Sequence, residues 1–426
     1  MSSKGREVFL FGAGAVIDWK GPTTDDLTKL VRECGFTLRN SDTKITEFIY
    51  QRLVDSDYDS KSEINFETII NVIEELIVYY SEFNSKKQTP SLLKVFLNEN
   101  DLCQIFNYSI EGGERKHLYK LQIPDGKEYE FSRSSYHNEN PNQFFLQHLL
   151  SVILTVIHSK VSKYTWNTSG YSVIDKTSKN SLNFRKWINA KYPQNVLRLY
   201  TLNYDNLFKS LLQEDDIECF DGFSDEYIDD NHAPAKIKRI ITDFDSFVHY
   251  NLHGSSYWNV LSDLIYKIQY PVIVKNKGIH LPLSDNVSSF QMEKGKTIFV
   301  SNIITGYQKT QKSAITPFRQ MQSAFDKDCI LADKITIIGY SFNDEHINES
   351  IKIAFKENSN LKIEIVDPNF INNKMDETFA NNLFPIFDNS LHSDAANKRY
   401  SYLKERIIVY TKYFSDYLKD ETNARE

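Results

Sequence analysis

The fold is decided by the stretch EVFLFGAGAVIDWKGPTTDDL, residues 7–27. Residues 7–11 are mostly apolar and run into Gly12-Ala13-Gly14, a pattern typical of a buried strand followed by a tight turn. A helix is predicted next, because Thr23 can cap it and Asp26 stands where the acid of a capping box belongs. Strand, glycine turn and helix in this order indicate the start of a parallel α/β sheet.

The same arrangement recurs further along the chain. Apolar runs end in polar turns at 196–200, 247–252, 334–338 and 362–366, and the runs 271–275 and 297–300 also predict strands. After the run 334–338, Asn343 or Asp344 can cap a helix with an apolar face. Strands that alternate with helices predict an α/β fold, a Rossmann-like parallel sheet with helices on both faces.

Two parts of the chain lie outside this alternation. Residues 43–189 are mainly helical in pattern, with Asn65 as the cap of an amphipathic helix, and no strand signal there is strong. We interpret this part as a large helical insertion. Residues 371–426 are mostly polar and predict a helical C-terminal lobe or tail. The Rossmann-like core would then consist of residues 1–42 and 190–370.

Composition is that of a soluble globular protein. Of the 426 residues, 41% are hydrophobic and 25% charged. The net charge of −7 argues against direct nucleic-acid binding, since phosphate contacts need Lys and Arg. The four cysteines are scattered, as in proteins of a reducing cytoplasm. The apolar stretch 144–157 is interrupted by polar residues and shorter than a membrane span, so we expect a cytoplasmic protein without membrane contact.

Polar clusters stand where the predicted strands end. In parallel α/β sheets, ligands bind beyond the carboxyl ends of the strands, so these clusters should meet around one site. The candidate ligand-binding residues of these clusters are Gly12, Ala13, Gly14, Thr201, Asp205, Gly339, Tyr340, Ser341, Asp367 and Asn369.

Each cluster has a structural and a chemical interpretation. Gly12-Ala13-Gly14 is either a plain turn or a cradle whose amides approach a pyrophosphate, although a dehydrogenase would have a third glycine where Ile17 stands. Asn203 either ends a strand or holds a ribose hydroxyl or a water through its amide. His253 either packs in the core or accepts a proton from water or a ribose hydroxyl.

The later clusters are interpreted in the same way. Gly339-Tyr340-Ser341 repeats the strand–turn–helix pattern of the first motif. Asp344 is interpreted as a helix cap and His346 as a residue of the helix surface or core. Asp367-Pro368-Asn369 is either an ordinary turn or a place where hydrogen bonds hold a nucleoside.

Several of these segments, in this order, resemble a known family. They are GAG at 12–14, TLNYD at 201–205, LHGS at 252–255 and GYSFNDEHIN at 339–348. Together they resemble the sirtuin-like domain of bacterial antiphage defence proteins. Sirtuins share the first three patterns, whereas GYSF-x-D, and NFE at the start of the helix at 65, resemble the bacterial defence branch. The resemblance covers roughly the core and leaves out the insertion and the tail.

The resemblance implies that NAD is the substrate and that Asn203 and His253 are catalytic. The bond between nicotinamide and ribose would be cleaved, to give nicotinamide and ADP-ribose. Pro22, in the loop after the glycine turn, would join the residues that bind NAD. The chain lacks the four-cysteine zinc module and the Phe and Arg of the G-I-P-D-F-R loop of deacylating sirtuins. No zinc is therefore expected, and water rather than an acyl group would attack the ribose.

The resemblance also implies control by a partner, because unrestrained cleavage would deplete a central cofactor. The insertion and the tail are candidate docking surfaces for other copies of the chain in a homo-oligomer, for a HerA-family ATPase or for a short Argonaute. Two other functions stay open. One is an NAD-dependent protein deacylase or ADP-ribosyltransferase, and the other is a non-catalytic sensor that binds NAD or ADP-ribose.

Overall fold

The structure, a computed structural model, describes most of the chain. The described residues are 4–56, 64–80, 104–112, 118–123, 128–134, 137–138, 141–165, 173–192, 194–215, 217–263, 270–276, 288–293, 296–305, 312–313, 315–369, 391–394 and 398–423. Cys103 and the stretch 371–390 of the expected tail lie outside these residues.

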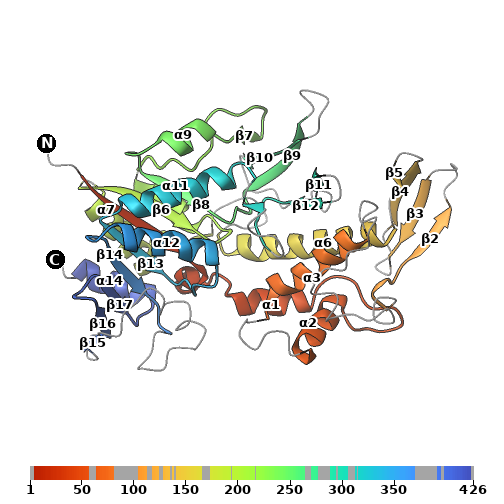
Figure 1. The fold of residues 1–426 in the computed structure, drawn as a ribbon, viewed down its shortest axis with the longest axis horizontal. Helices are drawn as coiled ribbons and strands as arrows, with labels where there is room; N and C mark the ends of the chain where they lie inside the picture. Colours follow the sequence, from red (N-terminus) through yellow and green to blue (C-terminus); the bar gives the residue numbers. More distant parts are fainter. Residues whose placement is uncertain are drawn as a thin grey trace.

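A central sheet of eight strands forms the core (Figure 1). Its strands are β1 (Gly5–Phe11), β6 (Asn195–Thr201), β8 (Val248–Asn251), β13 (Lys334–Ile338), β14 (Lys362–Val366), β15 (Leu391–Asp394), β16 (Arg399–Tyr402) and β17 (Ile407–Tyr410). They lie in the order β15-β16-β17-β14-β13-β1-β6-β8. All neighbours from β17 to β8 pair in parallel, while β15 and β16 add an antiparallel edge.

Helices cover both faces of this sheet, as the alternation of buried side chains in β1 requires. Val8 and Leu10 belong to one apolar core, and Phe9 and Phe11 to another. The first core includes α9 (Ile237–Thr242), α11 (Phe318–Leu331) and α12 (Glu345–Glu357). The second includes α7 (Lys179–Lys191), α8 (Leu207–Leu212) and α14 (Phe414–Asn423). The predicted Rossmann-like α/β architecture is confirmed.

The direction in which the chain builds the sheet reverses beside β1. From β1 the chain adds β6 and then β8 on one side, and it later adds β13, β14 and β17 on the other. The loops that follow β1 and β13 therefore diverge to opposite sides, which leaves a crevice at their carboxyl ends. This topological switch point is where open α/β sheets bind ligands.

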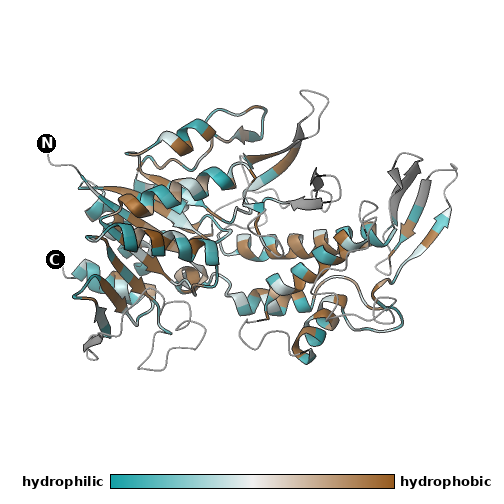
Figure 2. Ribbon diagram, in the orientation of Figure 1, coloured by the Kyte–Doolittle hydropathy of each residue, from teal (hydrophilic) through white to brown (hydrophobic). Residues whose placement is uncertain are grey.

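The insertion has an apolar core of its own. This core is built by α2 (Ile45–Asp55), α3 (Phe66–Tyr79) and α6 (Pro141–Lys163) together with α1 (Thr24–Arg32), which precedes the insertion, and these helices extend away from the sheet (Figure 1). Figure 2 shows that α3 and α6 are apolar along much of their length. The capping box of α1, between Thr23 and Asp26, forms as predicted. α7, by contrast, packs on the central sheet, with Trp187 edge-on to Phe9 at 5.1 Å.

The insertion, expected to be mainly helical, also contains strands. A four-stranded antiparallel sheet lies at its far end, formed by β2 (Ser109–Gly112), β3 (Leu118–Gln122), β4 (Glu128–Ser134) and β5 (His137–Asn138). In β3 and β4 apolar and polar residues alternate over only a few positions, too short a run to stand out from the helical pattern around it. The strands pair locally and antiparallel, and Leu121 of β3 is buried in the same apolar core as α3 and α6.

Two predicted strands exist but do not join the central sheet. The run 271–275 lies in β10 (Tyr270–Asn276), which pairs with β7 (His232–Pro234) and β9 (Trp258–Asp263). The run 297–300 lies in β12 (Lys296–Val300), which pairs with β11 (Ser288–Glu293). All three pairings are antiparallel, and β9–β10 and β11–β12 are pairs of strands that follow each other in the chain.

The C-terminal part is also less helical than its polar composition predicted. Where it is described, it contributes β15, β16 and β17 to the edge of the central sheet before it ends on α14. The expected helix is thus present, and the strands before it were missed. They were missed because β16 (RYSY) has no aliphatic residue and β17 (IIVY) is an apolar run of only four residues.

One helix of the described residues, α6, is long and apolar enough to cross a membrane. The helix is longer than the apolar stretch 144–157, because it continues beyond both ends of that stretch. Within its most apolar window, 56% is buried inside the protein, against the other helices of the insertion. A core helix of this kind meets the same criteria as a membrane span.

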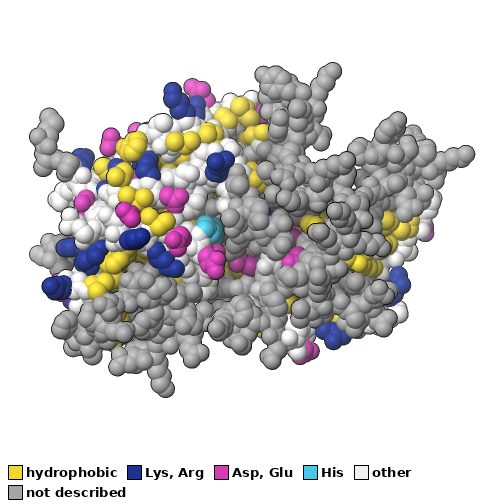
Figure 3. All heavy atoms as spheres, in the orientation of Figure 1, with side chains coloured by type: hydrophobic (Ala, Val, Ile, Leu, Met, Phe, Trp, Pro, Cys, Tyr) yellow, Lys and Arg dark blue, Asp and Glu magenta, His cyan; other side chains and the backbone are white. Residues whose placement is uncertain are grey.

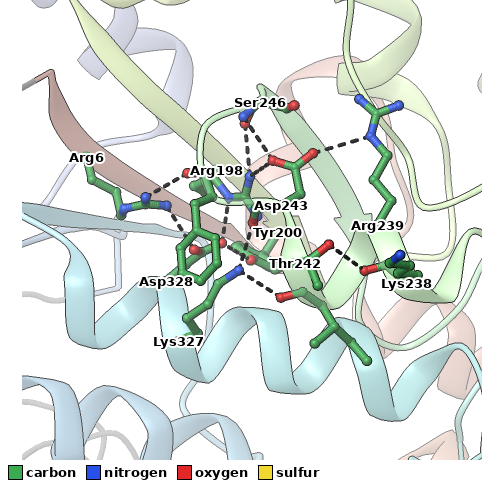
Figure 4. Close-up of polar contacts among 12 residues, drawn as sticks. Arg6, Arg198, Tyr200, Lys238, Arg239, Thr242, Asp243, Ser246, Lys327 and Asp328 are labelled. Carbon is green, nitrogen blue, oxygen red and sulfur yellow. Dashed lines mark hydrogen bonds and ion pairs between the residues drawn. The ribbon is translucent and has the colours of Figure 1, made fainter.

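A buried ionic network ties the central strands β1 and β6 to α11 (Figure 4). Asp328 of α11 accepts hydrogen bonds from Arg6 (2.9 Å), Arg198 (2.6 Å) and Tyr200 (2.5 Å). Arg198 donates further to the carbonyl of Ser246 at 2.9 Å. Both Arg198 and Asp328 are fully buried, so each charge depends on the other for compensation.

Candidate functional site

A cavity of about 420 Å³ lies at the carboxyl ends of the central strands, within the range usual for small-molecule sites. Its walls come from the loops after β1, β6, β8, β13 and β14 and from the starts of α1 and α3. The residues that line it are Gly12, Ala13, Gly14, Val16, Ile17, Pro22, Thr23, Thr24, Asp25, Leu27, Asn65, Phe66, Glu67, Val161, Leu202, Asn203, Tyr204, Asp205, His253, Gly339, Tyr340, Ser341, Asn343, Asp344, Asp367 and Asn369.

The structure thus brings together most of the side chains that the sequence singled out. All the predicted site residues line the cavity except Thr201, which lies behind it. The Thr201 hydroxyl accepts a hydrogen bond from the backbone amide of Asn203 at 3.0 Å. Thr201 therefore shapes the loop that carries Asn203 and has no place in the cavity wall.

The glycine turns after β1 and β13 pack directly on each other. Gly12 donates its amide to the carbonyl of Ile338 at 2.9 Å, and Gly14 donates to Gly339 at 2.8 Å. Gly339 has a φ of +59°, and a Cβ there would lie 2.2 Å from the amide nitrogen of Ala15. The amides of Gly12 and Gly14 are therefore engaged within the protein. A pyrophosphate cradle at this turn stays a prediction, and in this arrangement these two amides would not be its donors.

Three helices instead begin at the cavity. The N-cap residues Thr23 of α1, Asn65 of α3 and Asp344 of α12 all belong to its lining. The first turn of an α-helix carries partial positive charge on its free amides, which favours an anionic group nearby. The element directly after the first glycine turn is a 3-10 helix, η1 (Ala13–Trp19), and the predicted α-helix starts after it.

Asn203 lies at the centre of the site, after β6. Its side-chain amide donates to the carbonyl of Gly12 at 3.0 Å, which fixes the orientation of the side chain. The side-chain oxygen of Asn203 is then the atom that can accept a hydrogen bond from a ligand or a water. The residue is 9% exposed, so a group bound there would be largely shielded from solvent.

The loop that carries Asn203 is held by the loop after β8. The Asn251 side chain donates to the carbonyls of Asn203 (3.1 Å) and Asp205 (3.2 Å). Between them, the carbonyl of Tyr204 accepts hydrogen bonds from the hydroxyls of Ser255 (3.2 Å) and Ser256 (3.1 Å). This clamp fixes the relative positions of the two adjacent strand ends, β6 and β8, and hence of the candidate catalytic side chains.

Asp205 serves the local structure as well as the cavity. Its Oδ1 accepts the backbone amide of Leu207 at 2.8 Å, at the start of α8. Burial raises the pKa of the Asp205 carboxyl, while the contact with Tyr164 and the Leu207 amide act in the opposite direction. Asp205 can therefore end the turn before α8 and also contact a ligand in the cavity.

His253 follows β8 and faces the start of α12. Its side chain is buried, and its Nε2 lies 4.0 Å from Oδ2 of Asp344. The rings of His253 and His346 are 5.9 Å apart. The backbone is fixed by a hydrogen bond from the amide of Ile304 to the carbonyl of His253 at 2.7 Å. Figure 3 shows acidic side chains gathered beside a histidine on the face turned to the viewer.

The end of β14 forms the other side of the cavity. The amide of Asp367 donates to the carbonyl of Tyr410 at 3.0 Å, and its Oδ1 accepts the amide of Asn369 at 2.8 Å. Burial raises the pKa of the Asp367 carboxyl to about 6. At neutral pH the Asp367 carboxyl is thus ionised although its burial disfavours the charge. Acids at functional sites often have this property.

Several lining residues were missed or given another role by the sequence analysis. Asn65, Phe66 and Glu67 at the start of α3, and Val161 near the end of α6, bring the insertion into the cavity wall. The sequence shows the NFE segment, residues 65–67, as a feature of the family that the chain resembles, but does not predict that it lies in the site. Asp344 occupies the N-cap position of α12 as expected, but its side chain makes no cap hydrogen bond and lies near His253.

The charge of the lining is one-sided. Asp25, Glu67, Asp205, Asp344 and Asp367 belong to it, and no Lys or Arg does among the described residues. Carboxylates at this density stabilise a developing positive charge nearby. Helix N-termini and acidic side chains together suit a ligand that has anionic and cationic parts.

The fold and this cavity define a doubly wound α/β protein with a binding site at its topological switch point. Solved structures similar to the chain include a complex of a point mutant of a Sir2 homologue with ADP ribose (TM-score 0.38, 12% identity, 99% of this chain and 94% of the other covered). A second point mutant of a Sir2 homologue, also in complex with ADP ribose, has the same values. A Sir2 homolog–NAD complex has a TM-score of 0.36 at 10% identity, covering 99% of this chain and 90% of the other.

No protein-family model matches the sequence, and no curated protein does. The strand order and the two apolar cores that flank the sheet define the fold.

Proposed function

We propose that the protein is an NAD glycohydrolase, which cleaves the bond between nicotinamide and ribose to give nicotinamide and ADP-ribose. The observation that carries this proposal is the placement of Asn203 and His253. They follow adjacent parallel strands, line one cavity, and are held in register by the Asn251 clamp. The sequence resemblance to sirtuin-like domains assigns the same two residues as catalytic.

The order of the strands suggests how NAD would lie. The pyrophosphate would cross the crevice between β1 and β13, near the start of α12. The nicotinamide riboside would then lie beside Asn203 and His253, at the ends of β6 and β8. The adenosine would lie toward the end of β14. Helix N-termini favour the pyrophosphate, and the acidic lining favours the cationic nicotinamide ring.

In the proposed reaction the C1′–N1 glycosidic bond breaks, and its electron pair leaves with nicotinamide, which becomes neutral. The positive charge that develops on the ribose is stabilised by carboxylates such as Asp205. A water molecule, oriented by the side-chain oxygen of Asn203, forms the new bond to C1′. His253 accepts the proton that the water loses, and Asp344 lies close enough to stabilise the resulting imidazolium.

Control of this activity through the insertion is a further part of the proposal. The insertion supplies Asn65, Phe66, Glu67 and Val161 to the cavity wall, so a partner bound to it would contact the helices that shape the site. By the resemblance, that partner would be a HerA-family ATPase, a short Argonaute or further copies of the chain, in a cytoplasmic antiphage system. Light scattering of the chain with and without each candidate tests this part.

The test of the activity is analysis of the products by mass spectrometry after incubation with NAD, with and without a candidate partner. Nicotinamide and ADP-ribose in equal amounts are expected. The variants Asn203→Ala and His253→Ala should each lower turnover by about 10²-fold or more while circular dichroism stays unchanged. Full activity in both variants would remove these assignments. Acyl transfer from an acylated peptide would favour the deacylase, and binding without turnover the sensor.

A further inference from the structure

A buried segment, residues 301–305 and called the strap below, lies between the insertion and the loop that carries His253. Every residue of the strap is buried, although the strap follows β12 and is not part of a helix or a strand. Ile303 belongs to the apolar core of the insertion, and Ile304 to one of the cores that flank the central sheet. Because backbone polar groups of a buried, irregular segment need partners within the protein, the groups that bond the strap decide its position.

On one side the strap is bonded to the loop after β8. The amide of Ile304 donates to the carbonyl of His253 at 2.7 Å, and the amide of Ser255 donates to the carbonyl of Asn302 at 3.0 Å. Gly254, between them, has a φ of +86°, and a Cβ there would lie 2.1 Å from the carbonyl oxygen of Asn302. The strap therefore packs directly on the backbone of His253, and a displacement of the strap would displace that backbone.

On the other side the strap is bonded to α3 of the insertion through a buried lysine. Lys312 donates to the carbonyl of Thr305 at 2.6 Å and to Oε1 of Glu74 at 2.5 Å. The side chains of Lys312 and Glu74 are each 5% exposed, so each charge depends on the other for compensation. Glu74 thus holds the ammonium group that in turn holds the end of the strap.

The carbonyls of residues 302–305 all accept hydrogen bonds. Their donors, in chain order of the acceptors, are the Ser255 amide, the Ser301 hydroxyl, the Tyr204 hydroxyl and the Lys312 ammonium group. The bond from Lys312 is charge-assisted and is therefore of the strongest type among the four. Its loss would leave the buried carbonyl of Thr305 without this donor, at a cost that favours a shift of the strap.

We propose that Lys312 and Glu74 are positioning residues for His253 and hold its backbone in place through the strap. This role rests on the proposed function, in which His253 accepts the proton of the attacking water. A displaced strap would misplace the imidazole relative to that water and slow the reaction. Most of the cavity lies outside the contact between the strap and His253, so binding of NAD should change little.

The test uses a double variant of the full chain. Glu74→Gln/Lys312→Met removes the pair without leaving an uncompensated buried charge. It should lower kcat for NAD by about tenfold or more and change KM by less than about twofold. Amide hydrogen exchange should rise by about tenfold or more in residues 252–256 as well as in the strap, because the bonds that join the two segments weaken.

A matched double variant separates this effect from the loss of a buried ion pair in general. Glu7→Gln/Lys191→Met removes a pair between β1 and α7 whose lysine side chain is also 5% exposed. It should leave kcat and the exchange of both segments near their parental values. Exchange that rises in the strap alone, an unchanged kcat in Glu74→Gln/Lys312→Met, or an equal effect of the two double variants would overturn the inference.

Two further outcomes are decided by the same measurements. If Glu74→Gln/Lys312→Met does not fold, Lys312→Met alone takes its place. Burial raises the pKa of the Glu74 carboxyl to about 7 even beside Lys312, so the carboxyl is neutral at pH 7 once the cation is gone. If the parental chain does not cleave NAD, the proposed function fails, and hydrogen exchange alone decides whether Lys312 and Glu74 fix the backbone of His253.

Discussion

His253 and Asp344 face each other across the cavity, with 4.0 Å between Nε2 of the imidazole and Oδ2 of the carboxylate. They come from loops whose strands, β8 and β13, are separated by β6 and β1 in the sheet. The side chain of Asp344 is 14% exposed and that of His253 is 5% exposed, so solvent screens the pair only partly. The arrangement is that of an acid that orients a general base.

The first prediction concerns this pair. Asp344→Asn should lower kcat for NAD by about tenfold, because the imidazolium formed during the reaction loses a nearby negative charge. KM should change less, since the effect is on the transition state. Glu345→Gln, at the next residue and exposed, is the matched control and should keep the parental kcat. An unchanged kcat in Asp344→Asn would show that this carboxylate does not support His253.

The second prediction concerns the contact between the two glycine turns. Gly339→Ala should lower the free energy of unfolding by about 2 kcal/mol or more, because the residue has a positive φ and its Cβ would meet the backbone of Ala15. Urea denaturation measures the change. Gly112→Ala is the control, since a Cβ at that exposed strand position meets nothing within 4 Å. Equal stability of the two variants would mean that the turns separate without cost.

The sequence predicts the strands that surround the site because each of them combines an apolar run with a polar end. The run ending in Gly12 and the one ending in Thr201 are both buried in the middle of a parallel sheet, where such runs are continuous. Their shared carboxyl edge follows from parallel pairing alone. This is why most of the candidate site residues could be placed near one another without coordinates.

The parts that the sequence does not predict depend on tertiary packing. The start of α3 reaches the cavity because α3 packs on α1 and α6, and the amide of Phe66 donates to the Thr28 hydroxyl at 3.0 Å. No local pattern encodes that distance. In the same way, Asp344 has the sequence features of a cap, and only the position of β8 relative to β13 brings it near His253.

The third prediction follows from the raised pKa of Asp367. Since burial raises that pKa from 3.8 to about 6, the folded protein holds this proton more tightly than the unfolded chain. The contribution of this tighter proton binding to the free energy of unfolding is fully present below about pH 4 and is lost as the pH rises through about 6. At about pH 7.5 ionised Asp367 therefore destabilises the ligand-free fold, by up to about 3 kcal/mol.

Asp367→Asn should consequently raise Tm near neutral pH, and the gain should shrink toward pH 4. The amide can still accept the hydrogen bond from Asn369, so the local geometry is kept. Differential scanning calorimetry across this range measures the effect. A gain that is equal at both ends of the range would contradict the assignment of a raised pKa.

The last prediction concerns the buried ionic network around Asp328. Asp328→Ala removes the common acceptor of Arg6, Arg198 and Tyr200 and leaves the fully buried Arg198 without its main counter-charge. Such a loss costs about 3–5 kcal/mol in the free energy of unfolding. Asp245→Ala, an exposed acid near the same network, should cost much less. Because none of the four network residues lines the cavity, the folded fraction of Asp328→Ala should bind ADP-ribose with the parental Kd. If the variant binds ADP-ribose more weakly even when it is fully folded, the network and the cavity are coupled. A loss of less than about 1 kcal/mol in the free energy of unfolding would show that other groups compensate the charge of Arg198.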